Sequence, residues 1–204
     1  MSLHSLFLLV VGDDTLATSN EAGLLIDQDA PAKQIATIDT LHKTFDIWFD
    51  FFHTINDVKK YRSIFRLTTT TTNAGNLGDR LPAIHSRPQS RGNNLVLTYT
   101  FKDNVKYTID QPKKIGQWVR FNMRQKLIDG RYIHETFIDG KSVGKVENKN
   151  PVIFRNVAVF IGDLIVRPVN GRFDNFKIAS PAQNAIFGQF LVHVSTGLGN
   201  FTIY

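Results

Sequence analysis

Two Asp-Gly dipeptides, Asp129-Gly130 and Asp139-Gly140, constrain this chain more than any other feature of its sequence. Both lie between runs in which apolar and polar residues alternate. Both central positions of a type I′ hairpin turn need a positive φ, which Asp tolerates and Gly adopts freely. Residues 116–147 are therefore predicted to form three antiparallel strands joined by two tight turns.

The register of the first predicted hairpin can be read from its turn. With Asp129 and Gly130 as the loop residues, Arg124 falls opposite Glu135, and Phe121 falls opposite Ile138. One face of the hairpin is then charge-paired and the other is mostly apolar. This pattern is typical of an antiparallel sheet that is covered on one side and solvated on the other.

Length and composition are compatible with one all-β domain over residues 1–204. A chain of 204 residues with 42% hydrophobic content can bury a complete core without dividing. The formal charge of +6 and the pI near 9.6 favour anionic partners. The sequence contains no cysteine, which excludes disulfides and thiolate metal sites and leaves the redox compartment open.

Residues 6–11 form a short apolar run that is followed by Gly12-Asp13-Asp14. A cleaved signal peptide is one interpretation. An edge strand is favoured, because the run is short, carries no basic residue before it, and ends in turn residues. No stretch approaches the ~20 apolar residues that a membrane-spanning helix needs.

Further short strands are predicted on both sides of the central meander, and helical periodicity is nearly absent. The residues between 73 and 94 are rich in Gly, Asn, Pro and Arg and are predicted to form a long loop. The predicted strands cover residues 24–51 in short pieces, 61–68, 95–101, 105–109, 154–161, 164–166 and 172–178. Many short strands at regular spacing predict an antiparallel two-sheet jelly-roll sandwich.

Ordered motifs between residues 24 and 179 resemble laminin-G-like modules of the concanavalin A-like lectin/glucanase superfamily. The motifs are FDIWFD (45–50), SIF (63–65), GDRLPAI (78–84), GQW (116–118), FIDGK (137–141), NVAVFIGD (156–163) and GRFDNF (171–176). The resemblance implies two curved antiparallel sheets, an extracellular or cell-surface location, and binding of a glycan or protein through loops at one rim. It also implies calcium in some members. Residues 1–23 and 181–204 lie outside the pattern and are predicted to add edge strands.

Enzyme motifs in the sequence fail their structural requirements. Ser142 lies in a G-x-S-x-G sequence, but it follows a hairpin turn and not the strand-to-helix turn of a nucleophile elbow. Glucanases with this fold resemble one another through a Glu-x-Asp-x-x-Glu strand. The glutamates here, Glu21, Glu135 and Glu147, do not have that spacing. No catalytic residue is predicted, and a glycoside hydrolase remains the least favoured alternative.

Metal binding receives little support from the sequence. The six histidines are scattered singly, so a zinc site is not expected. Asp79 and Asp163 are the candidate calcium ligands by their position in the resembling family. The favoured alternative for Asp79 is that it pairs with Arg80 or caps the backbone of its own loop.

The loop 78–94 supplies the predicted ligand-binding residues, which are Arg80, His85, Arg87 and Arg91. Guanidinium groups bind sulfate and carboxylate through paired hydrogen bonds. For Arg80, a structural ion pair within its Gly-Asp-Arg-Leu-Pro motif is an equal alternative. Trp48 and Trp118 could stack on sugar rings, but both adjoin predicted strands and packing is the favoured alternative.

The leading functional hypothesis is a non-catalytic recognition module that binds a glycan or an extracellular protein through rim loops. The alternative is a structural protein that self-associates through exposed strand edges and the threonine tract 68–72. Nucleic acid is not an expected partner, because the basic residues are spread over many strands and no nucleic-acid motif interleaves them with aromatic residues.

The C-terminal residues 187–204 are predicted to form a hairpin that joins a sheet of the jelly roll or of a neighbouring copy. Both faces of its first strand are apolar. Deleting residues 187–204 should therefore expose apolar surface and lower the melting temperature or the solubility. An unchanged melting temperature would show that these residues are a tail or an assembly arm.

Overall fold

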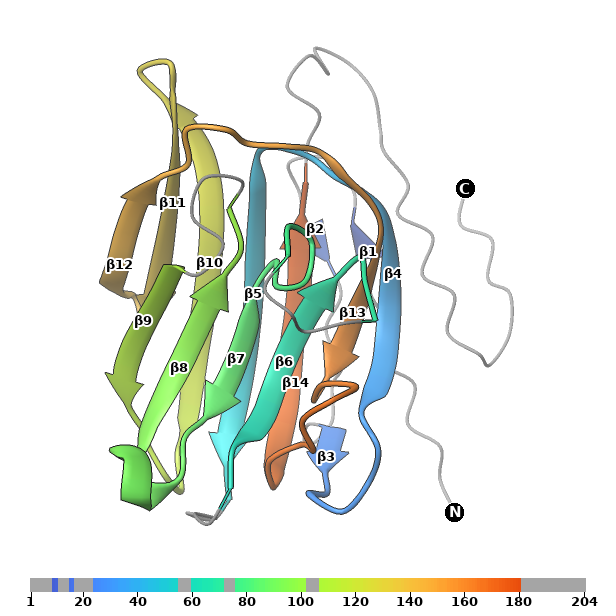
Figure 1. Ribbon diagram of the computed structural model, residues 1–204, viewed down its shortest axis with the longest axis vertical. Coiled ribbons are helices and arrows are strands. Elements are labelled where there is room, and N and C mark those ends of the chain that lie inside the picture. The colour runs from blue at the N-terminus through green and yellow to red at the C-terminus, as the bar shows by residue number, and fades with distance from the viewer. Residues whose placement is uncertain are drawn as a thin grey trace.

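The computed structural model describes residues 9–10, 15–16, 24–54, 60–71, 76–101 and 107–180. These residues form two six-stranded antiparallel sheets that pack face to face (Figure 1). The front sheet of Figure 1 has the order β4 (Lys33–Leu41), β13 (Phe154–Ile161), β6 (Arg62–Thr68), β7 (Ala83–Ser86), β8 (Asn94–Tyr99) and β9 (Tyr107–Pro112). The back sheet has the order β12 (Lys141–Glu147), β11 (Arg131–Ile138), β10 (Trp118–Ile128), β5 (Phe45–His53), β14 (Gly171–Ala179) and β3 (Leu24–Ile26).

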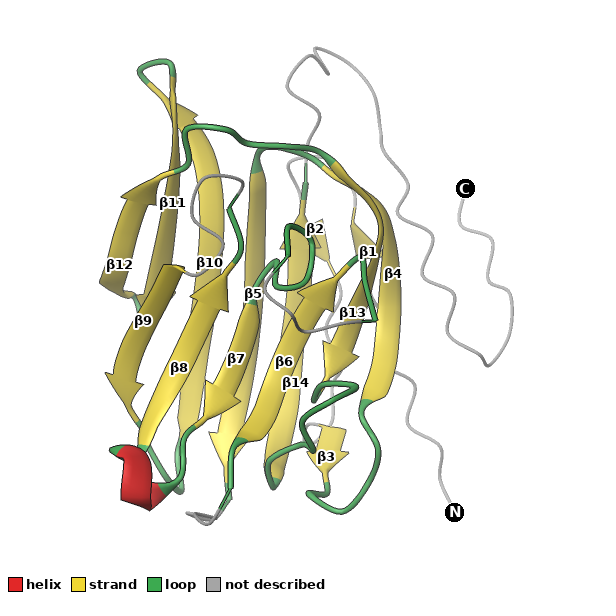
Figure 2. Cartoon of the chain, in the orientation of Figure 1, coloured by secondary structure: helices red, strands yellow, loops and turns green. Residues whose placement is uncertain are grey.

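The predicted all-β sandwich is confirmed, and its helical content within the described residues is one 3-10 turn, η1 (Gln89–Arg91) (Figure 2). The short strands β1 (Leu9–Val10) and β2 (Thr15–Leu16) pair with each other and lie near β14. None of the described residues belongs to a helix that is long and apolar enough to cross a membrane. The predicted turn 102–104, the rest of the N-terminal run 6–11 and the C-terminal hairpin 187–204 lie outside the described residues.

The central meander has the predicted register. Arg124 pairs with Glu135 and Phe121 with Ile138 across β10 and β11. Asp129 and Asp139 have φ values of 49° and 51°, and the glycine that follows each also has a positive φ, as the hairpin turns require. Local turn chemistry thus fixes three strands of the back sheet.

Stacked aromatic rings join the two sheets. Phe49 of β5 has its ring centroid 5.0 Å from that of Phe121 and 4.9 Å from that of Phe173 on the neighbouring strands. Its centroid also lies 4.7 Å from that of Phe65 on β6 of the opposite sheet. The alternation in residues 45–51 correctly identified the inner face of β5, because Ile47, Phe49 and Phe51 are all buried.

The prediction of one long loop from residue 73 to residue 94 is wrong. Its middle forms β7, which pairs on one side with β6 and on the other with β8. All four residues of β7 are buried, so the strand shows no alternation of exposed and covered positions. Pro82 and Pro88, which flank the strand, made this part of the sequence resemble a loop.

Residues 164–166 were predicted as a strand and instead form a bend. The Asp163 side chain causes it, because its Oδ1 accepts a hydrogen bond of 3.0 Å from the backbone N–H of Ile165. Leu164 and Ile165 are both about half exposed. These two apolar residues therefore lie at the surface and do not belong to a core strand.

His134 on β11 is a buried histidine without hydrogen bonds to its ring nitrogens from the described residues. Its ring centroid lies 4.1 Å from that of Tyr99 and 5.4 Å from that of Phe101. Burial among these rings lowers the pKa of His134 to about 3. The imidazole is therefore neutral at physiological pH.

His134 should make the protein sensitive to mild acid. Its pKa is lower in the folded than in the unfolded chain, so stability is lost as pH falls from about 6.5 towards 3. Going from pH 7 to pH 5 should cost about 2 kcal/mol of unfolding free energy through this residue. Urea denaturation of the wild type and of His134→Phe at both pH values measures it. An equal acid loss in both proteins would contradict the assignment.

Candidate functional site

The structure divides the predicted ligand-binding residues between opposite ends of β7 and β8. The carbonyl of Arg80 accepts a 2.9 Å hydrogen bond from Thr100 N at one end, and Arg87 N donates one of 2.8 Å to Asn94 O at the other. His85 is buried within β7. The four side chains therefore do not form one rim site. Arg87 and Arg91 come together at Tyr61, whereas Arg80 and His85 both interact with Asp163.

A buried arginine, Arg66 of β6, binds both predicted calcium ligands. Its Nε donates to the Asp79 carbonyl at 2.9 Å, and its NH1 group donates to Asp163 Oδ1 at 2.7 Å. The side chains of Arg66 and Asp163 are both fully buried. A structural ion pair of Arg80 was one of two equal alternatives for that residue, and the fully buried guanidinium of this region is that of Arg66.

The predicted alternative for Asp79 holds, since its carboxylate caps its own loop. It accepts hydrogen bonds from the Asn76 N–H at 2.8 Å and from the Thr70 hydroxyl. Thr68 and Thr70 likewise bond to this loop or to each other. The described part of the threonine tract is thus held within the chain and does not offer a free strand edge.

The charged carboxylate of Asp163 is stabilised by groups of the protein itself. Burial alone would raise its pKa, but contacts from His85, Ile165 N–H and Arg66 outweigh burial and lower it. His85 Nε2 lies 3.5 Å from Asp163 Oδ2, which is long for a hydrogen bond. A guanidinium between Asp79 and Asp163 repels a cation, so these residues do not fit calcium. The described residues contain no group of three acidic or histidine side chains arranged for a metal.

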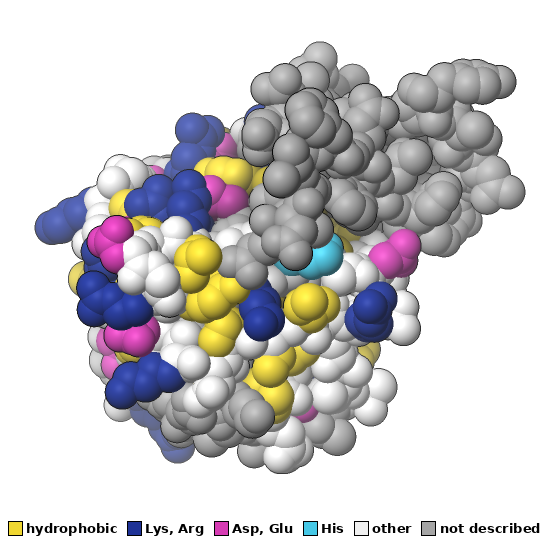
Figure 3. All heavy atoms as spheres, turned by 90° about the horizontal axis from the view of Figure 1, so that it is seen from above, with side chains coloured by type: hydrophobic (Ala, Val, Ile, Leu, Met, Phe, Trp, Pro, Cys, Tyr) yellow, Lys and Arg dark blue, Asp and Glu magenta, His cyan; other side chains and the backbone are white. Residues whose placement is uncertain are grey.

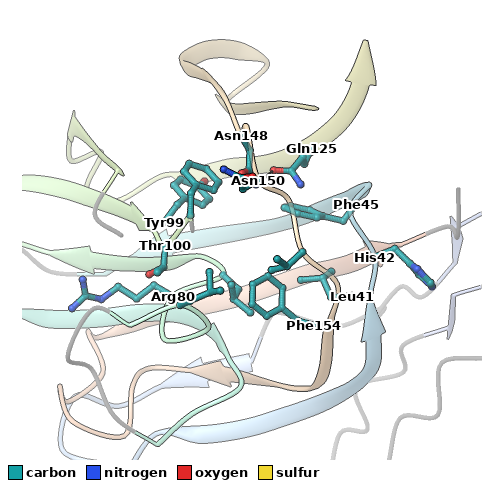
Figure 4. Close-up of a pocket in the computed structure, with 14 residues that line it drawn as sticks. Leu41, His42, Phe45, Arg80, Tyr99, Thr100, Gln125, Asn148, Asn150 and Phe154 are labelled. Carbon is teal, nitrogen blue, oxygen red and sulfur yellow. Dashed lines mark hydrogen bonds between the residues drawn. The ribbon is translucent and has the colours of Figure 1, made fainter. Parts of the chain in front are cut away.

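A narrow pocket opens at the upper end of the sandwich between the two sheets (Figure 4). Its walls are mainly aromatic and aliphatic, and a Gln125–Asn148 amide pair lines one side. In Figure 4 the Arg80 guanidinium extends away from the other lining side chains. Figure 3, which looks onto this end, shows hydrophobic side chains gathered near Lys and Arg. The cavity of about 30 Å³ has room for little more than one or two waters.

A larger hollow of about 280 Å³ lies on the outer face of the back sheet. It is lined by Trp48 and Asp50 of β5, Arg120 of β10, and Asn175 and Lys177 of β14. Its volume is close to the lower end of the range of small-ligand sites, and it combines one aromatic ring with four polar or charged side chains. We take it as the candidate site and call it the back-sheet hollow.

Strand alternation places the β5 and β10 side chains of the hollow. Ile47, Phe49 and Phe51 face the core, so the residues between them face outward. Arg120 pairs with Asp50 in the ladder between β10 and β5. One row further along, Trp48 lies between Asn122 of β10 and Lys177 of β14.

A β-bulge in β14 completes the hollow. The pairing with β5 shifts between Asp174 and Lys177, and Asn175 there has a φ of 52°. Phe173 and Phe176 are both buried although they are three positions apart, where strict alternation would place them on opposite faces. The extra residue therefore turns Lys177 to the outer face.

Asp50 orients two of the polar side chains of the hollow. Arg120 donates from Nε to Asp50 Oδ1 at 2.8 Å and from its NH2 group to Oδ2 at 3.0 Å. Asn175 Nδ2 donates to Oδ2 at 2.7 Å. Hydrogen bonding with Asp50, together with its charge, raises the pKa of Arg120. The Arg120 side chain stays 64% exposed, so its remaining N–H groups can reach a ligand.

The expectation that both tryptophans pack is wrong for Trp118 and incomplete for Trp48. Trp118 is 43% exposed, with its ring edge-on to Phe52 at 5.6 Å, and Trp48 lines the hollow. The sequence did indicate that Trp48 faces outward, because in the alternating pattern of β5 it occupies the same set of positions as Asp46 and Asp50. An aromatic residue on the polar face of a strand marks an exposed ring.

No family model matches the sequence, and a search of curated proteins found no match. Among solved structures, the chain is similar to a native heptameric SAP-like pentraxin from Limulus polyphemus. The TM-score is 0.51 at 14% identity, over 76% of this chain and 73% of the pentraxin chain. It is also similar to the Caenorhabditis elegans galectin LEC-6, with a TM-score of 0.44 at 11% identity, over 75% and 94% of the two chains.

A third similar structure is the Ruminococcus gnavus IT-sialidase CBM40 bound to α2,3-sialyllactose. The TM-score is 0.47 at 9% identity, over 76% of this chain and 92% of that chain. At such identities the likenesses concern the fold alone. The antiparallel two-sheet jelly-roll sandwich that the sequence predicted is the fold of this chain, and it is similar to that of the pentraxin.

Replacing Arg66 by Met should strongly destabilise the protein. It would leave the Asp163 carboxylate buried without its guanidinium, and such a loss costs about 3–5 kcal/mol. The matched control is Arg87→Met, whose ion pair with Asp110 is partly exposed and should cost about 1 kcal/mol or less. Urea denaturation compares the two. Similar losses for both variants would show that Arg66 does not anchor the loops.

Proposed function

We propose that this protein is a non-catalytic recognition module that binds a glycan in the back-sheet hollow. The observation that carries the proposal is a tryptophan ring beside polar side chains that a buried carboxylate holds in place. A sugar ring has an apolar C–H face and hydroxyl groups around its edge. The hollow offers one surface for each.

The polar groups of the hollow complement hydroxyl groups. The side-chain amide of Asn175 donates an N–H to Asp50. The side-chain carbonyl oxygen of Asn175 can then accept a hydrogen bond from a ligand. Arg120 and Lys177 supply donors. A hydroxyl can donate to Asn175 and accept from either cation, so a ligand with several hydroxyls can satisfy all three side chains.

The arrangement of Asp50 supports a binding role and not a catalytic one. Both of its oxygens already accept hydrogen bonds, from Arg120 and from Asn175. A glycoside hydrolase of this kind needs two carboxyl groups that flank the scissile bond. Asp50 is the one carboxylate among the described residues that line the hollow.

A glycan ligand accords with the extracellular or cell-surface location that the sequence resemblance implied. It also moves the proposed contact from the rim loops to the outer face of the back sheet. The rigid strands of that face fix the side chains more firmly than loops would.

Trp48→Ala should abolish most glycan binding. Truncating an aromatic residue at the centre of a binding site typically costs at least about 2 kcal/mol, or roughly thirtyfold in Kd. Trp118→Ala is the matched control, since Trp118 lies on the same face and does not line the hollow. A glycan array identifies the ligand, and calorimetry compares the two variants. No binding to neutral, acidic or sulfated glycans, or equal losses in both variants, would contradict the proposal.

A further inference from the structure

Basic side chains that the hollow does not use gather around Tyr61, next to the first residue of β6. Figure 1 shows the start of β6 and the beginning of β8 at the lower end of the sandwich. Arg87 Nε donates to the Tyr61 hydroxyl at 3.1 Å, and Arg91 lies 5.6 Å from the centre of the Tyr61 ring. Lys60, the neighbour of Tyr61, is exposed. Lys113 Nζ donates to the Arg87 carbonyl and, at 3.1 Å, to Asn93 Oδ1.

The segment that carries Lys113 connects this cluster to the back-sheet hollow. It leads from β9 of the front sheet to β10 of the back sheet, and Gly116 N bonds to the carbonyl of His53 at the end of β5. The next residue, Lys114, forms an ion pair with Asp139. Asp139 Oδ1 also accepts a 2.9 Å hydrogen bond from the backbone N–H of Arg120, whose side chain lines the hollow.

A continuous band of cations therefore leads from the hollow around the lower end. We call it the basic track, and its members are Lys177, Arg120, Lys114, Lys113, Arg87, Arg91 and Lys60. Its length is roughly 10 Å along the last residues of β5 and about 10 Å across to the front sheet. This is longer than one sugar in the hollow requires.

The carboxylates along the track are already engaged. Asp50 binds Arg120, Asp139 binds Lys114, and Asp110 binds Arg87. Within the described part of the chain, Lys60, Arg91 and Lys177 form no ion pair with a carboxylate. The track therefore carries a positive excess in a chain whose formal net charge is +6.

We propose that the ligand is an anionic polysaccharide chain, with one sugar in the back-sheet hollow and its acidic neighbours along the basic track to Arg91. This inference rests on the proposed function and adds the length and charge of the ligand. Carboxylate and sulfate groups share the required chemistry, because guanidinium and ammonium groups bind both.

The hollow favours a polysaccharide over a nucleic acid. A single-stranded nucleic acid needs several open aromatic rings on which successive bases stack. Along this face the partly exposed rings of Trp118 and Tyr61 each already have a partner within the protein, Phe52 edge-on to Trp118 and the Arg91 guanidinium over Tyr61. The hollow sets one aromatic ring beside amide, guanidinium and ammonium groups, a combination that suits the C–H face and the hydroxyls of a sugar.

The test removes charge from the track without touching the hollow. Arg91→Gln combined with Lys114→Gln removes two exposed cations. Arg131→Gln combined with Lys149→Gln is the matched control, because both residues are exposed outside the track and the change in net charge is the same. Binding is measured by calorimetry at two salt concentrations, with a uronate disaccharide, a long polyuronate, a long sulfated polysaccharide and single-stranded polynucleotide as probes.

The inference predicts that the track variant binds one or both long polysaccharides at least tenfold more weakly than the control at low salt. Its salt dependence should also be shallower, because fewer counterions are released. Disaccharide binding should be unchanged in the track variant and lost in Trp48→Ala. The long polymer that responds identifies the acidic group.

Three results would overturn the inference. Equal affinity of the track and control variants for both long polymers would show that the basic track does not bind the ligand. The proposed function would be unaffected. Long-chain binding that depends on the track and ignores Trp48, with no disaccharide bound, would refute the proposed function and the continuous site together. Tighter binding of the polynucleotide than of either polysaccharide would assign the track to nucleic acid.

Discussion

The buried guanidinium of Arg66 is the interaction on which the organisation of the front sheet depends. It binds the Asp79 carbonyl, the Asp163 carboxylate and the Thr68 hydroxyl, and so ties two loops to the outer side of β6. A fully buried cation would be very costly without such partners. The loops therefore have to stay closed over the strand, and His85, which lies beside Asp163, is buried with it.

This closure shapes the two outer faces of the sandwich differently. With the outer side of β6 and β7 covered, His85 is buried and Arg80 is partly buried. The outer face of the back sheet remains open, and the β14 bulge arranges Asn175 and Lys177 beside Trp48 there. Asp50, bonded on both oxygens, makes that surface rigid before a ligand arrives, which reduces the entropy that binding costs.

Local chemistry explains what the sequence could predict. The two Asp-Gly turns and strict alternation determined the meander, its register and the inner face of β5, because these depend on neighbours in the chain. The strand β7 and the buried Arg66 depend on distant segments that cover them, and no local pattern reports that cover. The spacing of Phe173 and Phe176 does indicate the bulge in β14, and the position of Trp48 between Asp46 and Asp50 does indicate that it faces outward. Part of the site could therefore be predicted from the sequence.

The central claim is that Trp48 contacts the ligand, and its own fluorescence tests this directly. The chain has two tryptophans, so Trp118→Phe leaves Trp48 as the single indole reporter. Titration with a glycan that the wild type binds should change the Trp48 emission saturably, with a midpoint at the Kd from calorimetry. Undiminished binding by calorimetry with no change in emission would contradict the account.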